Sequence, residues 1–139
     1  MRTPHFLRLA QIDEVRFISG CRSGVVHLTW NRTTIRFAAD EFRRLADLLS
    51  MACQSDPPSS LWDGNLHVTC RLEEDCELRL GSLVLLLSPD ELQDLGQAAR
   101  EAVQRLEEIA ASGVWDEPEE ERPSANPFDL LGRPSFSQN

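Results

Sequence analysis

The sequence predicts an α+β fold in which two tandem strand-strand-strand-helix units form antiparallel sheet, with two main helices packed on it. Three observations predict this fold: a similar pattern recurs after 50 residues, strand-like segments alternate with a two-residue period, and amphipathic helical segments follow them. We expect the units at about residues 14–53 and 65–112, joined by a linker over 54–64. Together they fill one domain, residues 1–113, of the 139-residue chain.

The repeat aligns residues 26–45 with residues 76–95 without a gap. Few residues are identical, but Asp40-Glu41 falls on Asp90-Glu91, and apolar residues fall on apolar residues along the rest of the alignment. We interpret the pattern as an internal duplication. Coincidence between two ordinary hairpin–helix units is the alternative.

Each unit begins with segments that have the period of half-buried strands. Val26, Leu28 and Trp30 alternate with polar residues, Asn31-Arg32 provides a turn, and residues 33–37 return as a second strand. An earlier strand is expected at residues 14–19. The second unit has the corresponding strands at residues 66–72, 76–80 and 83–87.

The helix of the second unit has the clearest local pattern in the chain. Ser88-Pro89-Asp90-Glu91 provides an N-cap serine, a proline at the first helical position and a glutamate at the third. An apolar stripe then continues at helical spacing to about Ala111. The first helix is expected from about Ala39 to Cys53, with acidic residues in its first turn where they suit the helix dipole.

One strand is apolar on both of its faces. Residues 83–87 are Leu-Val-Leu-Leu-Leu, whereas the matching residues 33–37 alternate with polar side chains. Such a strand either lies at the centre of a sheet under two layers or meets another protein. The second explanation makes Val84 and Leu86 candidate partner-binding residues, for a second copy of the chain or for a different protein.

The composition changes after the second helix. Residues 114–139 are acidic and rich in proline, without apolar periodicity, which predicts a disordered tail. An apolar cluster stands within it, and Phe128, Leu130 and Leu131 are the candidate anchors for a partner's groove. The alternative is that the cluster folds back onto its own domain.

Charge and residue usage exclude several functions. The net charge is −9, which argues against nucleic-acid partners, and all 14 basic residues are arginines. Because lysine and tyrosine are absent, no chemistry that needs their side chains is available. The N-terminal segment lacks the apolar core of a secretory signal, and the longest apolar run is too short to span a membrane. We therefore expect a cytoplasmic protein without membrane insertion.

The sequence contains no recognisable catalytic or cofactor motif. Four cysteines are expected as reduced thiols, and His67 and Cys70, three apart in a strand, should point to opposite faces rather than share a metal. We therefore expect no catalytic residue, no cofactor and no metal. A small enzyme without a known motif is the alternative, and it would bring together two or more of four side chains: His27, His67, Cys70 and Glu77.

Residues 24–37, followed by Asp40-Glu41-Phe42, resemble a small family of uncharacterised bacterial domains with a histidine-leucine strand, a turn, a second strand and an acidic-acidic-phenylalanine helix start. The resemblance covers about 30 residues and implies no activity. In size, acidity and element order the chain is also similar to type III secretion chaperones, whose strands and helices form a dimer around a client segment. The expected function is thus a non-enzymatic interaction protein that binds a protein partner through its sheet face, its tail or both; an acidic secretion or assembly chaperone is the alternative.

Overall fold

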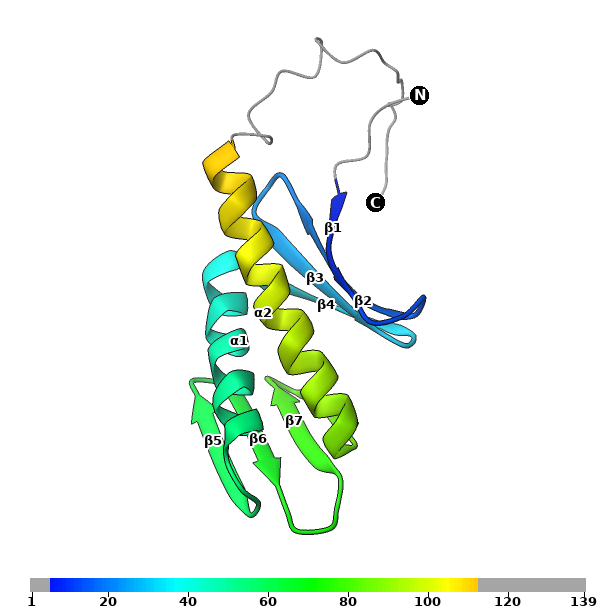
Figure 1. The fold of residues 1–139 in the computed structure, drawn as a ribbon, viewed down its shortest axis with the longest axis vertical. Coiled ribbons are helices and arrows are strands. Elements are labelled where there is room, and N and C mark those ends of the chain that lie inside the picture. Colours follow the sequence, from blue (N-terminus) through cyan, green and yellow to red (C-terminus); the bar gives the residue numbers. More distant parts are fainter. Residues whose placement is uncertain (1–5, 113–139) are drawn as a thin grey trace.

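The computed structural model describes residues 6–112, which form two four-stranded sheets and two helices (Figure 1). The first sheet contains β1 (Phe6–Gln11), β2 (Arg16–Cys21), β3 (Val25–Trp30) and β4 (Thr33–Ala38). The second sheet contains β5 (Ser59–Asp63), β6 (Leu66–Cys70), β7 (Cys76–Leu80) and β8 (Leu83–Leu87). Helix α1 (Ala39–Gln54) follows β4, and helix α2 (Pro89–Ser112) follows β8. The predicted α+β class is confirmed.

The two units match in local structure as well as in element order. In both sheets the strands pair antiparallel in chain order, and β2, β4 and α1 each begin 50 residues before β6, β8 and α2. The turns after β3 and β7 match in detail, because Asn31 and Gly81 both have a positive φ, of 60° and 66°. Their amides donate equivalent hydrogen bonds, Asn31 N to Val15 O at 2.8 Å and Gly81 N to Asn65 O at 3.0 Å. The 50-residue pattern therefore marks the same local structure twice.

Each unit has four strands where the sequence predicted three. The first strand, β1, contains a bulge between Arg8 and Ala10, so that Leu9 and Ala10 are both buried and the alternation is broken. The expected linker over residues 54–64 is wrong in part, because β5 occupies residues 59–63. This strand is short, and the large apolar side chain of Trp62 points to the solvent. The sequence of the strand therefore lacks the usual alternation of inward apolar and outward polar residues.

The helices lie side by side and antiparallel, and each extends from its own unit to the sheet of the other (Figure 1). Helix α1 contacts β5 and β6, and α2 contacts β1 and β2. The apolar face of α1 is buried at four positions: Phe42, Leu45, Leu49 and Ala52. Both sheets and both helices contribute to a single buried cluster, so residues 6–112 form one domain with a shared core.

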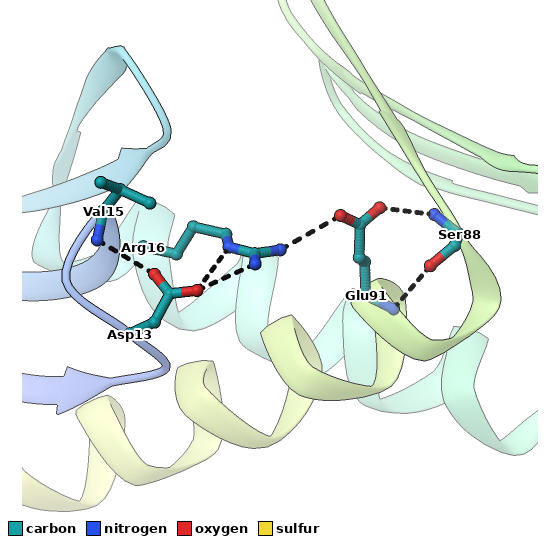
Figure 2. A network of polar contacts seen from close by, with 5 residues as sticks. All are labelled: Asp13, Val15, Arg16, Ser88 and Glu91. Atoms are coloured by element: carbon teal, nitrogen blue, oxygen red, sulfur yellow. Dashed lines mark hydrogen bonds and ion pairs between the residues drawn. The ribbon is translucent and has the colours of Figure 1, made fainter.

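A polar network joins the first unit to the start of α2 (Figure 2). The guanidinium of Arg16 in β2 lies 2.8 Å from Asp13 and 3.1 Å from Glu91 in α2. The second oxygen of Glu91 accepts a hydrogen bond from the amide of Ser88, whose hydroxyl accepts one from the amide of Glu91. The predicted capping box is therefore present, and it also fixes the carboxylate that receives Arg16.

Candidate functional site

The helices cover the inner face of the second sheet, and its outer face points away from the core. The strand register arranges the outward side chains in two rows across the sheet. One row is Trp62, His67, Arg79 and Val84, and the other is Ser60, Thr69, Glu77 and Leu86. We call these eight residues the open face.

Apolar side chains occupy both margins of the open face. Trp62 on β5 is 68% exposed, and Leu86 on β8 is 66% exposed, with Val84 half-buried beside it. The two central strands carry polar side chains, among them the ion pair between Arg79 and Glu77 at 3.3 Å. The open face therefore has a polar centre between two apolar margins, an arrangement found in protein interfaces as well as on free surfaces.

The place of β8 decides between the two explanations of its apolar sequence. The strand lies at the edge of the second sheet, where β7 is its neighbour. The explanation that residues 83–87 form a central strand covered on both sides is therefore wrong. Within the described residues, Val84 and Leu86 point outward from an edge strand with no layer over them.

The edge strands of the two sheets differ in how they discourage pairing with another chain. β1 has a bulge and Arg8, β4 has Arg36, and β5 ends in Asp63. Bulges and charged residues are the features by which proteins protect sheet edges. β8 has no charge, no proline and no bulge in its register. It is thus the edge strand best suited to add a strand from another protein.

His67 stands at the centre of the open face in a small polar cluster. Its Nε2 is hydrogen-bonded with the hydroxyl of Ser60 at 2.7 Å and lies 3.2 Å from the hydroxyl of Thr69, while the ring of Trp62 packs edge-on at 5.9 Å. A serine–histidine contact of this length occurs in hydrolases, where a carboxylate orients the ring from its other nitrogen. Among the described residues, no carboxylate bonds to the ring of His67. Within the described residues, the hydroxyls of Ser60 and Thr69 hold the ring of His67 at Nε2.

Of the four side chains that would favour an enzyme, two share one face of the second sheet and the other two lie elsewhere. His27 lies on the first sheet, and Cys70 is buried on the inner face, opposite His67 as predicted. Only His67 and Glu77 share the open face, in neighbouring rows, and Glu77 is paired with Arg79.

Three thiols gather where α1 meets the second sheet. Burial raises the pKa of the Cys76 thiol to about 12, and a hydrogen bond with Cys70 and the nearby charge of Asp75 add to the effect. Burial also raises the pKa of Cys53, whose thiol donates to the carbonyl of Leu92 at 3.6 Å, while Arg100 acts against this increase. Protonated, buried thiols are poor nucleophiles. In residues 6–112 no three side chains of the ligand types are grouped as a metal site.

We expect the free energy of unfolding to fall as the pH rises from about 9 toward 12, because the unfolded chain releases the Cys76 proton there and the folded chain retains it. Below pH 9.0, the ordinary pKa, the contribution is complete. Lysine and tyrosine, which would otherwise titrate in this range, are absent. Urea unfolding at several alkaline pH values measures the slope. Cys76→Ala should flatten it and Cys21→Ala should leave it steep; an equal slope in both variants would contradict the assignment.

The structure describes two of the five sequence-predicted partner-binding residues. Val84 and Leu86 stand together on β8, whereas Phe128, Leu130 and Leu131 lie outside the described residues. The sequence analysis missed Trp62, since it fell within the expected linker. The Asp63-Gly64-Asn65 turn that follows it, with Gly64 at a φ of 63°, is a hairpin sequence that could have revealed β5.

No family model, no curated protein and no solved structure matches this chain. The helices of the described region do not combine the length and apolar character needed to cross a membrane.

Proposed function

We propose that this chain is a non-enzymatic protein-interaction protein, a subunit, adaptor or assembly factor, that binds a protein partner at the open face and along the edge of β8. The observation that supports it most is the uncharged apolar edge strand with Val84 and Leu86 directed outward. An unprotected edge promotes aggregation in a protein that functions alone, whereas a protein that binds a partner can use it to add the partner's strand.

In the proposed complex, a strand of the partner lies beside β8 and continues the second sheet. Main-chain hydrogen bonds would supply affinity that depends little on sequence, and contacts to alternate side chains would supply specificity. Val84 and Leu86 are two residues apart, so they present one continuous apolar strip to the partner. The exposed indole of Trp62, at the opposite margin, is the natural anchor for a partner that spans the sheet.

The tail is the second proposed contact. Phe128, Leu130 and Leu131 could anchor a partner independently of the sheet. A chain that lacks residues 123–139 separates the two contributions: loss of a partner with the truncation alone assigns it to the tail, and loss with β8 variants alone assigns it to the sheet.

The test is affinity capture from the native host with the tagged full chain. Val84→Glu together with Leu86→Glu should remove the partner, because burying two carboxylates against apolar surface weakens binding by at least about 100-fold. Thr34→Glu is the matched control, since Thr34 occupies the position 50 residues before Val84 on the edge strand of the first sheet. Light scattering on the same three proteins shows whether the partner is a second copy. Capture of the same proteins by all three chains would refute the proposal.

A further inference from the structure

The outer face of the first sheet has a different chemistry from the open face. The register of all four strands aligns Arg8, Ser19, His27 and Arg36 in one row across the sheet. We call these four residues the basic row. The four strands of this sheet contain no aspartate and no glutamate, in a chain whose net charge is −9. This face is therefore a local exception to the acidity of the molecule.

Three residues of the basic row, Arg8, Ser19 and His27, line a hollow with aromatic walls, and Arg36 lies beside His27 at its margin. A cavity of about 460 Å³ opens on this face, and the rings of Phe6 and Phe17 line it together with Arg8 and His27. The guanidinium of Arg8 stacks 3.8 Å from the centre of the Phe17 ring, and Phe6 meets His27 edge-on at 5.1 Å. Stacking of this kind holds a cationic group in place while its N–H donors stay available to an anion.

The described strands of the first sheet place no carboxylate beside His27. Partial burial and the neighbouring guanidinium of Arg36 lower the pKa of His27. The charged groups that share its face are Arg8 on β1 and Arg36 on β4, both positive. A carboxylate bound between them would reverse the balance and favour the protonated ring.

The chain itself contains a segment of matching charge. Residues 116–121 hold five carboxylates in six positions, and they follow directly after α2. The last turns of α2 run alongside the first sheet, at the end where β1 begins (Figure 1). The side chain of Leu106 in α2 lies beside Gly20 of β2. Cys21, which follows Gly20, pairs with Phe6 at the rim of the hollow.

The acidic segment is long enough to cover the basic row. Residue 116 follows Ser112 by four positions and residue 121 by nine, which gives a reach of roughly 13 to 30 Å at about 3.3 Å per residue. The basic row crosses four strands and therefore extends over about 14 Å. The six residues 116–121 span up to about 20 Å when extended, so the segment is long enough to lie along the whole row.

We propose that the acidic segment 116–121 of this chain docks on the outer face of the first sheet, with its carboxylates paired to Arg8 in the hollow and to Arg36 beside it. A tethered segment is present at an effective concentration in the millimolar range, which gives it an advantage over free acidic peptides. This inference is independent of the partner site on the second sheet.

The experiment is an NMR titration of the full chain in two forms, wild type and a chain in which the carboxylates of residues 116–121 are replaced by their amides. We expect the pKa of His27 to be higher in the wild type by about one unit, because docked carboxylates favour the protonated ring. The amide signals of Ser19, Thr29 and Thr34 should differ between the two forms, and those of the second sheet should coincide. Arg8→Gln together with Arg36→Gln should remove these amide differences.

The control neutralises a second acidic segment, the loop between β6 and β7, which holds three carboxylates where residues 116–121 hold five. Glu73→Gln, Glu74→Gln and Asp75→Asn change the net charge without touching residues 116–121, and they should leave His27 and its neighbours as in the wild type. An equal shift in this control would mean that His27 responds only to net charge, and it would overturn the proposal. An unchanged His27 in the amide-tail chain would overturn it as well. The proposal would also be overturned if the signals of the hollow changed on addition of a glutamate-rich peptide but did not differ between the wild-type and amide-tail chains. The occupant would then be a partner.

Discussion

Phe42→Ala is expected to lower the free energy of unfolding by about 3–5 kcal/mol, a large part of the stability of a domain of this size. Phe42 is 0% exposed, and its ring meets Phe37 edge-on at 5.7 Å. The truncation removes both this contact and the apolar volume that seals α1 against the core. Urea unfolding of the full chain measures the change. Met51→Ala on the same helix is the control: Met51 is 55% exposed, so its removal should change the stability by no more than about 0.5 kcal/mol.

The same variant tests whether the two units unfold together. Because α1 packs on β5 and β6 of the other unit, loss of Phe42 should shift the unfolding of both sheets to the same lower urea concentration. Amide resonances from β3 and β7 report the two sheets separately in one NMR titration. A second sheet that keeps the wild-type midpoint while the first one melts early would contradict the shared core.

Gly96→Ala is expected to destabilise the wild-type chain by about 1–3 kcal/mol, although alanine is the better helix former. Gly96 lies where α2 crosses α1, and a Cβ there would stand 2.8 Å from the sulfur of Cys53. The remaining neighbours of that Cβ, both in Leu49, are at 3.8 and 3.9 Å, which is ordinary contact. The thiol of Cys53 is therefore the obstacle.

Removing the thiol should reverse the sign of this effect. In a Cys53→Ala background, Gly96→Ala should stabilise the chain by about 0.5–1 kcal/mol, because the helix propensity remains and the clash is gone. Ala46, 50 residues before Gly96, shows that the corresponding position of α1 accepts a Cβ. A double-mutant cycle in urea measures the coupling, and the same sign in both backgrounds would contradict the crossing geometry.

The elements that could be predicted from the sequence are those with a local pattern. The alternation of Val26, Leu28 and Trp30 and the capping box at Ser88 identified their strand and helix because both depend on neighbours in the chain. β1 and β5 were not predicted because each has an irregular local pattern. β1 contains a bulge, and β5 directs the indole of Trp62 outward. The extension of each helix over the sheet of the other unit could not be predicted, because an apolar stripe does not specify which sheet it will cover.

The candidate sites divide in the same way. The apolar run of β8 marked Val84 and Leu86 as unusual, but only the strand order shows that they stand at an edge. The basic row could not be found in the sequence. Arg8, His27 and Arg36 belong to three different strands, and they become neighbours only through the register of the sheet. Long-range pairing thus provides what local patterns lack.

Amide hydrogen exchange of β8, in the free chain and in the captured complex, tests the central claim that another protein binds at this edge. Every second amide of an edge strand points away from its sheet, so β8 of the free chain should exchange these protons quickly. The complex should protect them strongly, while the outward amides of β4, the matching edge of the first sheet, should exchange as before. Equal exchange of β8 in the free and bound states, or protection confined to other elements, would contradict the account.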